Sequence, residues 1–205
     1  MIITGTDTNV GKTVVAAMLT LGLGVNYFKP IQCGTHPETD IETVRRLTGL
    51  GADRILDPPI TLSQPLSPHL ASELDGVTID ADTLRLPKGR VIVEGAGGLM
   101  VPVTRKKLFI DLFAAWQRPV VLVARTGLGT LNHTLLSLEA LRARKIEILG
   151  VVFVGEENPD NMKTIEDMGT VKVLGRVPIL ATLDANNLNQ VFKHNFNKAD
   201  FESKL

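Results

Sequence analysis

The chain contains several short runs of residues that are apolar at every position. The clearest are rich in β-branched residues and cover Met1–Thr4, Val91–Val93, Val120–Val123 and Ile148–Val154, and weaker runs cover Val25–Phe28 and Val171–Leu174. Continuous apolar runs, in contrast to alternating ones, are typical of strands that are covered on both faces. The pattern therefore predicts a buried sheet whose strands are mainly parallel.

Stretches that favour helices lie between these runs. They cover Lys12–Leu23, Ile41–Leu50, Leu108–Trp116, Thr130–Arg144 and Asn161–Met168. Strands that alternate with helices favour an α/β fold, in which right-handed crossovers bring each strand back parallel to the one before it. We therefore expect a three-layer arrangement with a mainly parallel central sheet.

Two regions follow this alternation less regularly. Leu56–Ser72 is rich in proline, which predicts a long surface loop around a short helix. In the polar tail that starts at Asn186, four apolar residues recur at near-helical spacing, namely Leu188, Val191, Phe192 and Phe196. This spacing predicts a final helix that docks on the body of the protein.

The composition is that of an ordinary globular protein. Of the 205 residues, 44% are apolar and 21% are charged, and this length fits one domain over residues 1–205. Basic and acidic residues both total 22, so no global field attracts nucleic acid or an anionic membrane. Cys33 is the only cysteine, which excludes an intrachain disulfide. We expect a cytoplasmic protein, because no signal peptide or long apolar run occurs.

A glycine-containing segment, Gly5-Thr-Asp-Thr-Asn-Val-Gly-Lys-Thr13, directly follows the first predicted strand and opens the first predicted helix. A P-loop requires this order of strand, loop and helix. Backbone N–H groups at a helix N-terminus bind phosphate oxygens, and Lys12 adds a full positive charge. Thr13 places a hydroxyl where a Mg²⁺ ion that bridges two phosphates binds. The segment predicts a P-loop NTPase-like fold that uses ATP and Mg²⁺.

The match to the usual P-loop pattern is imperfect, because Thr6 stands where the first glycine is expected and that glycine is displaced to Gly5. The alternative is an ordinary turn in which Lys12 is merely solvated. Two more glycine clusters, Gly95–Gly98 and Gly127–Asn132, also follow predicted strands. Neither contains the third glycine of the dinucleotide fingerprint, so a hydride-transfer enzyme is disfavoured.

Three charged residues outside the loop are candidates for the same site. Glu94 ends the predicted strand Val91–Val93, where a carboxylate either holds Mg²⁺ or simply closes the strand. Asp40 opens the helix Ile41–Leu50 and is either a metal ligand or the helix N-cap. Lys29 follows the second predicted strand and either stabilises charge on a γ-phosphate or contributes ordinary surface charge.

The landmarks of the chain resemble those of dethiobiotin synthetase, in the same order. They are Gly5–Thr13, Lys29-Pro30, Val93-Glu-Gly-Ala-Gly-Gly98 and Gly127-Leu-Gly-Thr-Leu-Asn-His133. The resemblance implies an ATP-dependent cyclo-ligase that joins CO₂ to 7,8-diaminononanoate (7,8-diaminopelargonate) and closes a cyclic urea. The product is dethiobiotin, formed together with ADP and phosphate in biotin synthesis.

The resemblance also implies roles for individual residues. Lys12 and Lys29 would be catalytic and would bind the carbamate and the γ-phosphate, while Thr13, Asp40 and Glu94 would hold Mg²⁺. The nucleotide would contact Thr8, Asn9, Val10, Gly11, Lys12, Thr13, Glu94 and Gly97. These roles agree with those that the residues themselves favour.

The family is dimeric, which implies a homodimer with its sites at the subunit boundary. The substrate would contact Cys33, Leu128, Gly129, Thr130, Leu131 and Asn132. Residues 128–132 form the turn that would bind the substrate carboxylate across the subunit boundary. Cys33 stands where related enzymes often carry a hydroxyl residue. Gly155 stands near the point where the family often carries an asparagine that recognises adenine, which predicts relaxed nucleotide selectivity.

Two other P-loop classes are alternatives. A switch or partitioning ATPase binds a protein or surface according to its nucleotide state, but usually carries an extra lysine early in the loop, where this chain has Thr6 and Asp7. The amidating synthases of cobalamin synthesis normally carry an additional amidotransferase domain, for which 205 residues leave no room. A synthetase that acts on small molecules is therefore the preferred hypothesis.

Overall fold

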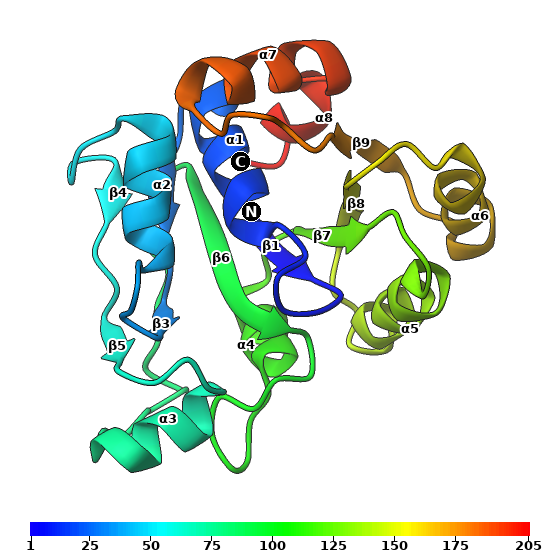
Figure 1. Cartoon of the computed structure of the whole chain (residues 1–205). Helices are drawn as coiled ribbons and strands as arrows, with labels where there is room; N and C mark the ends of the chain where they lie inside the picture. The colour runs from blue at the N-terminus through cyan, green and yellow to red at the C-terminus, as the bar shows by residue number, and fades with distance from the viewer.

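The computed structural model describes residues 1–205 and contains two sheets. The strands of the main sheet are β1 (Ile2–Gly5), β2 (Asn26–Phe28), β4 (Ile55–Leu56), β6 (Val91–Gly98), β7 (Val120–Arg125), β8 (Ile148–Val154) and β9 (Val173–Val177). They run in the order β4-β2-β6-β1-β7-β8-β9, and every neighbouring pair is parallel. The two remaining strands, β3 (Ile31–Cys33) and β5 (Ile60–Leu62), pair in a separate small sheet (Figure 1).

Helices cover both faces of the main sheet. The helices of the chain are α1 (Lys12–Leu23), α2 (Asp40–Thr48), α3 (Pro68–Asp75), α4 (Phe109–Trp116), α5 (Thr130–Ala143), α6 (Pro159–Gly169), α7 (Ala185–Asn195) and α8 (Ala199–Glu202). Of these, α3 contacts the small sheet of β3 and β5. One hydrophobic core joins α1, α2, α7 and α8 to the sheet, and two further cores join α4, α5 and α6 to the opposite face. The predicted three-layer α/β fold is therefore confirmed (Figure 1). None of the helices combines the length and the hydrophobicity needed to cross a bilayer.

Successive residues of the central strands point into opposite cores. In β1, Ile2 packs into the core that contains α4, while Ile3 packs into the core that contains α1. In β6, Ile92 faces the α1 side and Val93 faces the α4 side. Both faces of these strands are buried, which explains why their sequences are mainly apolar and do not alternate with polar residues.

The strand that was predicted to end at Val93 continues to Gly98, so Glu94 lies within β6 and not at its end. Glycine normally weakens a strand, and the sequence alone therefore favoured a loop here. The surroundings leave no room for larger residues, since a Cβ atom at Gly95 would lie 2.8 Å from Phe113 Cζ. The small residues from Gly95 onward let β6 continue beside β1, where Gly98 pairs with Gly5 at the start of the P-loop.

Two other predicted boundaries also differ from the structure. The proline-rich loop contains the short helix that was expected, α3, but also strand β5, whose partner β3 is distant in the sequence. The strand predicted over Val171–Leu174 is β9, which starts at Val173. Val171 N–H still donates to the backbone oxygen of Glu166, so this residue belongs to the turn that closes α6.

The predicted final helix is confirmed as α7, which packs on α1, and the short α8 follows it. The ring centroid of Phe192 lies 6.1 Å from that of Phe196 and 6.2 Å from that of Phe201. Helix α1 accommodates this cluster at Gly22, where a Cβ atom would lie 2.3 Å from Phe192 Cδ1. The tail is therefore part of the core around α1.

Replacement of Phe192 by alanine tests this packing. Phe192 is 5% exposed, and a core Phe→Ala change costs about 3–5 kcal/mol because lost burial and a new cavity both contribute. We expect the free energy of unfolding, measured by urea denaturation, to fall by about this amount. Leu183→Ala is the control, because Leu183 is 43% exposed and a change below about 0.5 kcal/mol is expected. Equal, small effects of the two substitutions would show that the tail does not stabilise the fold.

Candidate active site

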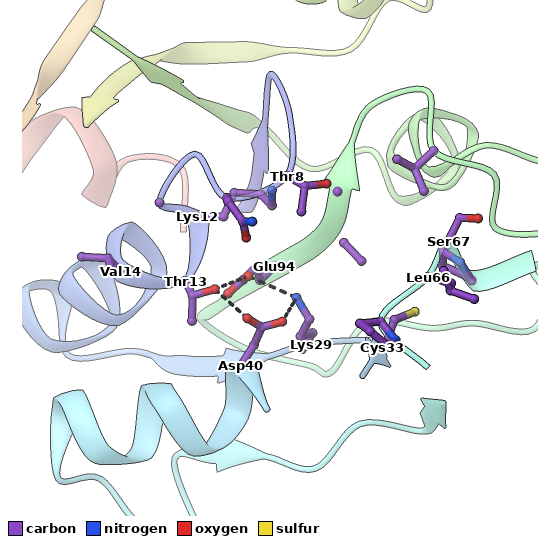
Figure 2. Close-up of a pocket in the computed structure, with 17 residues that line it drawn as sticks. Thr8, Lys12, Thr13, Val14, Lys29, Cys33, Asp40, Leu66, Ser67 and Glu94 are labelled. Atoms are coloured by element: carbon purple, nitrogen blue, oxygen red, sulfur yellow. Dashed lines mark hydrogen bonds and ion pairs between the residues drawn. The ribbon is translucent and has the colours of Figure 1, made fainter. Parts of the chain in front are cut away.

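The P-loop leads from the end of β1 into the first turn of α1 (Figure 2). Gly11 precedes the helix with a φ of 96°, a left-handed conformation that glycine adopts without strain. No side chain caps the N-terminus of α1, and the first turn holds no acidic residue. The backbone N–H groups of this turn are therefore open to an anion, as phosphate binding requires.

Lys12 is folded back onto the loop that precedes it. Its Nζ donates to the backbone oxygen of Asp7 at 2.7 Å, and the residue is 7% exposed. Burial lowers the pKa of Lys12 to about 8, an effect that Glu94 opposes and Lys29 reinforces. The alternative of a solvated lysine is wrong, because the ammonium group is held inside the loop.

Three side-chain oxygens from distant parts of the chain meet at the first turn of α1. Thr13 Oγ1 lies 2.9 Å from both Asp40 Oδ1 and Glu94 Oε1 (Figure 2). A hydroxyl has only one proton, so it cannot donate to both carboxylates at once. The hydroxyl therefore donates to one carboxylate at a time, and its own lone pairs remain available to a cation.

The chemistry of these oxygens fits Mg²⁺. The ion prefers oxygen ligands and commonly takes only one or two carboxylates, with phosphates and water completing its shell. No group of three histidine, cysteine, aspartate or glutamate side chains converges in the structure, so the protein offers no complete cage of its own. The two carboxylates and one hydroxyl suit a metal that binds together with nucleotide phosphates.

Lys29 is buried against the same two carboxylates. Its Nζ lies 2.9 Å from Asp40 Oδ2 and 3.1 Å from Glu94 Oε1, and the residue is 2% exposed. Burial opposes the charged form, but the carboxylates outweigh it and raise the pKa of Lys29 above its ordinary value. Lys29 is a fixed cation of the site, and the alternative of a surface lysine is wrong.

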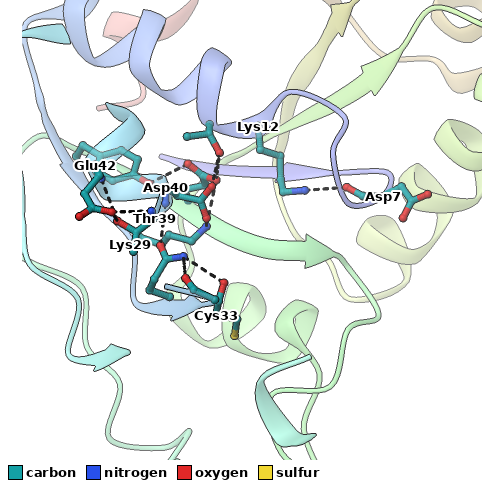
Figure 3. Close-up of polar contacts among 12 residues, drawn as sticks. Asp7, Lys12, Lys29, Cys33, Thr39, Asp40 and Glu42 are labelled. Atoms are coloured by element: carbon teal, nitrogen blue, oxygen red, sulfur yellow. Dashed lines mark hydrogen bonds and ion pairs between the residues drawn. The ribbon is translucent and has the colours of Figure 1, made fainter. Parts of the chain in front are cut away.

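The side chain of Asp40 points into the site and does not cap its own helix. The N-cap is Thr39, whose Oγ1 accepts from Glu42 N–H at 3.1 Å while Glu42 Oε2 accepts from Thr39 N–H at 2.7 Å (Figure 3). This capping box leaves the Asp40 carboxylate free to contact Lys29 and Thr13. Burial opposes ionisation of Asp40, but the Lys29 ammonium outweighs it and lowers the pKa of the carboxyl group.

Two buried residues that the sequence did not single out support these carboxylates. Tyr27 Oη donates to Glu94 Oε2 at 2.9 Å. Gln32 Oε1 accepts from Asp40 N–H at 3.2 Å, and its Nε2 donates to the backbone oxygens of the next two residues. The only signal in the sequence was the strand alternation that puts Tyr27 on the same face as Lys29, two residues later.

The P-loop and the side chains of Lys29, Asp40 and Glu94 line a cavity of about 740 Å³, which lies in the range of small-molecule sites. Of the residues that the sequence assigned, the cavity contains Thr8, Asn9, Gly11, Lys12, Thr13, Lys29, Cys33, Asp40, Glu94 and Gly97. The lining residues that were not anticipated are Val14, Pro65, Leu66, Ser67, Pro68, Ala96 and Val101. Polar and charged groups thus converge at the P-loop, and a mainly apolar wall faces them (Figure 2).

Other assigned residues do not reach this cavity. Val10 is 2% exposed and its side chain packs in the core around α1, so only its backbone is available to a phosphate. Leu128–Asn132 form an exposed turn and the start of α5, outside the cavity of their own chain. Their contact with substrate across a subunit boundary remains a prediction.

Gly155, which departs from the family pattern, directly follows β8 with a φ of 137°. A Cβ atom at this position would lie 2.4 Å from Thr126 Oγ1, so a larger residue does not fit. The backbone oxygen of Gly155 accepts from Arg176 Nη1 at 2.8 Å. Position 155 therefore provides no side chain for the recognition of a base.

The parallel sheet and the phosphate loop with its buried lysines and carboxylates define a P-loop NTPase. The fold is similar to that of a ParA family ATPase from Chlorobium tepidum, with a TM-score of 0.54 and 11% identity over 94% of this chain and 97% of that one. It is also similar to a chain of the MinC:MinD cell division protein complex of Aquifex aeolicus, with a TM-score of 0.51 and 13% identity over 92% of this chain and 84% of that one. At such identities the likeness concerns the fold alone.

The sequence itself identifies the family within this class. A family described as AAA domain matches residues 1–187. The ATP-dependent dethiobiotin synthetase BioD of Rhodopseudomonas palustris is 54% identical over 98% of this chain and 95% of that protein. The protein of the same name from Bradyrhizobium diazoefficiens is 52% identical over 98% of this chain and 97% of its own length. The chain belongs to the ATP-dependent dethiobiotin synthetase family.

The reactivity of Cys33 tests the electrostatics of the cavity. Burial raises the pKa of Cys33 to about 11, although the charge of Lys29 opposes this shift. At pH 8 the thiolate is then about 100-fold scarcer than in an unperturbed thiol, and we expect iodoacetamide labelling to be about 100-fold slower than in urea-unfolded protein. Intact-protein mass spectrometry reports Cys33 alone, because the chain has no other cysteine.

The pH profile separates this effect from poor access. A raised pKa makes the labelling rate climb about tenfold per pH unit up to about pH 10, whereas poor access lowers the rate equally at every pH. A rate that levels off near the ordinary thiol pKa would contradict the assignment.

Proposed function

We propose that the chain is an ATP-dependent dethiobiotin synthetase, a cyclo-ligase of biotin biosynthesis. It joins CO₂ to 7,8-diaminononanoate and closes the ureido ring to give dethiobiotin, ADP and phosphate. The proposal rests on the meeting of two lysines and three metal-binding oxygens in one cavity at the P-loop. Relatives of this name that match almost the full chain at more than half identity support the choice of substrates.

The P-loop binds the phosphates of ATP. The first turn of α1 supplies free backbone N–H groups. Lys12 supplies a positive charge, and its ammonium group donates a hydrogen bond to the backbone oxygen of Asp7. Thr13, Asp40 and Glu94 would hold Mg²⁺, which would supply positive charge beside the phosphates of the nucleotide. Lys12 and Lys29 thus place two cations in the cavity where the phosphoryl group is transferred.

The reaction needs no nucleophile from the protein. One substrate amine combines with CO₂ to form a carbamate, whose oxygen attacks the γ-phosphorus as the bond to the ADP oxygen breaks. The second amine then attacks the carbonyl carbon of the mixed anhydride, expels phosphate and closes the ring. The protein contributes positioning and charge stabilisation, for which Lys12 and Lys29 suffice, and Cys33 has no covalent role.

The apolar wall of the cavity is suited to the carbon chain of the substrate. Pro65, Leu66, Pro68 and Val101 face the P-loop across the cavity, and their side chains carry no charge. Burial of methylene groups against such a wall stabilises the bound substrate and excludes water from the reacting groups. Cys33 also lines the cavity, where its thiol donates a hydrogen bond to the carbamate less well than a hydroxyl group would.

We also propose that the protein is a cytoplasmic homodimer. Met100, Leu128 and Leu136 are large apolar residues with at least half of their surface exposed, and Met100 and Leu136 line a second cavity of about 480 Å³ beside the P-loop. Exposed apolar groups that lie together, as Met100 and Leu136 do, are typical of protein interfaces. The N-terminus of α5, at Gly129, has no side-chain cap, so its N–H groups are available to the substrate carboxylate in the partner's site.

Phosphate release from ATP tests the reaction directly. We expect release only when diaminononanoate, bicarbonate and Mg²⁺ are all present, with an equal amount of dethiobiotin detected by mass spectrometry. Other nucleoside triphosphates should also support the reaction, because position 155 has no side chain to select adenine. Hydrolysis without diaminononanoate that a second protein stimulates would instead favour a switch ATPase.

Substitution of Lys12 by alanine tests the assigned site. Turnover should fall by at least about 100-fold, because the charge acts on the transferred phosphoryl group, while the circular dichroism spectrum stays unchanged. Lys163→Ala is the control, because the side chain of Lys163 is 73% exposed on α6 and lies outside the cavity. Similar turnover in both variants would refute the role of Lys12.

A mixture of two inactive variants tests whether subunits share their sites. Lys12→Ala disables the P-loop of its own chain, and Gly129→Asp puts a carboxylate at the turn that serves the partner. A Cβ atom at Gly129 would have no neighbour closer than 4.0 Å, so a side chain fits there. The φ of Gly129 is 90°, a conformation that aspartate tolerates better than most residues do. Random mixing makes half of the dimers mixed, each with one intact site, so roughly a quarter of wild-type activity should return.

The matched control is Gly129→Asn, which has the same shape without the charge and should retain most of the activity. If the mixture stays inactive, the turn does not complete the site of a partner subunit.

A further inference from the structure

We propose that Tyr27 is a positioning residue that sets the affinity of the site for Mg²⁺, by fixing the carboxylate of Glu94. The inference rests on the proposed function, because it assumes that Glu94 is a metal ligand. Neither the P-loop pattern nor the reaction assigns a role to Tyr27, which comes from β2 and does not line the cavity.

The two oxygens of Glu94 have different partners. Oε1 lies 2.9 Å from Thr13 Oγ1 and 3.1 Å from Lys29 Nζ, so this oxygen belongs to the candidate metal site. Oε2 accepts from Tyr27 Oη at 2.9 Å. The hydrogen bond from Tyr27 thus holds Oε2 of the carboxylate, while Oε1 points toward Thr13 and Lys29.

The sheet fixes this contact. In the parallel pairing of β2 with β6, Tyr27 is opposite Ile92, and alternation places Glu94 on the same face as Ile92. Tyr27 is 0% exposed and packs in the core that contains α1 and α2, so its ring cannot swing away without disturbing that core.

A hydrogen bond of this kind matters because a glutamate carboxylate turns easily. The terminal torsion of glutamate has broad minima, so burial alone does not define where Oε1 points. Groups that orient a metal ligand from behind typically change metal affinity by about 10–100-fold when they are removed. The alternative is that Tyr27 only satisfies a buried carboxylate, in which case its hydroxyl affects stability and not the metal.

The Tyr27→Phe variant separates these roles, because it removes the hydroxyl and keeps the ring. We expect the Kd of Mg²⁺ for the ADP-saturated protein, measured by calorimetry well below the unfolding temperature, to rise about 10–100-fold. The Kd of ADP in EDTA should change by less than about twofold, because the P-loop is untouched. Unchanged Mg²⁺ binding with a lower unfolding temperature would overturn the proposal.

The control is Thr48→Val. Thr48 is 6% exposed on α2, and its hydroxyl donates to the backbone oxygen of Val44 at 2.6 Å, away from the cavity. This variant also loses a hydrogen-bonded hydroxyl near the same core, but it should bind Mg²⁺ as the wild type does. Equal loss of Mg²⁺ affinity in both variants would mean that the effect is one of stability.

A second measurement leaves the hydroxyl in place. Tyr27 is the only tyrosine of the chain, so uniform incorporation of 3-fluorotyrosine labels this position alone. We expect the ¹⁹F resonance to move when Mg²⁺ is added to the ADP-bound protein, and to stay in place when ADP is added in EDTA. A resonance that does not respond to Mg²⁺ refutes the link between Tyr27 and the metal.

Failure of the proposed function gives a different result. If the wild-type protein shows no Mg²⁺-dependent binding of ADP at all, then the assignment of Glu94 as a metal ligand is wrong. If the wild type binds Mg²⁺ with ADP and only the Tyr27 experiments give no effect, then the metal site stands and the positioning role does not.

Discussion

The structure depends on the mutual neutralisation of buried charges where β2, β6 and β1 lie side by side. β1 leads through the P-loop to Thr13, β2 leads to Lys29, and β6 carries Glu94. Lys29 and Glu94 are 2% and 1% exposed, and either charge alone would be strongly destabilising at this depth. Only the observed strand order brings the two together, so the sheet that buries them also pairs them. The fold and the site therefore constrain each other.

This arrangement also explains how a widespread fold comes to serve a particular chemistry. The ParA family ATPase and the MinC:MinD complex share the sheet and helices at 11% and 13% identity, which shows that the scaffold does not fix the function. The chemistry of this chain depends on the side chains around its phosphate loop. A buried second lysine, two carboxylates that share one hydroxyl, and an apolar wall opposite them equip the cavity for phosphoryl transfer to a small organic acceptor.

The site is also continuous with the core behind it. Tyr27 belongs both to the hydrophobic core around α1 and to the hydrogen-bond network of Glu94, and Gln32 ties the start of α2 to the turn after β3. Packing forces that hold the core thus also hold the carboxylates that we propose as metal ligands. Such a connection places the ligands on rigid elements, which is what a site needs when its work is positioning.

The sequence by itself determined what depends on neighbours within a few residues: the buried strands, the P-loop between β1 and α1, and the final helix with its apolar spacing. It did not decide whether Asp40 is a helix N-cap or a metal ligand. It also placed Glu94 at the end of a strand, because the glycines that follow predicted a loop. Only the tertiary structure decided that the Asp40 carboxylate meets Lys29 and Thr13, that Phe113 keeps Gly95 free of a side chain, and that Tyr27 reaches Glu94. The physical reason is that local conformation follows from the backbone preferences of each residue and its near neighbours. The contact of Lys29 with Asp40 and Glu94 depends instead on strand order and burial, which bring together parts of the chain that are far apart.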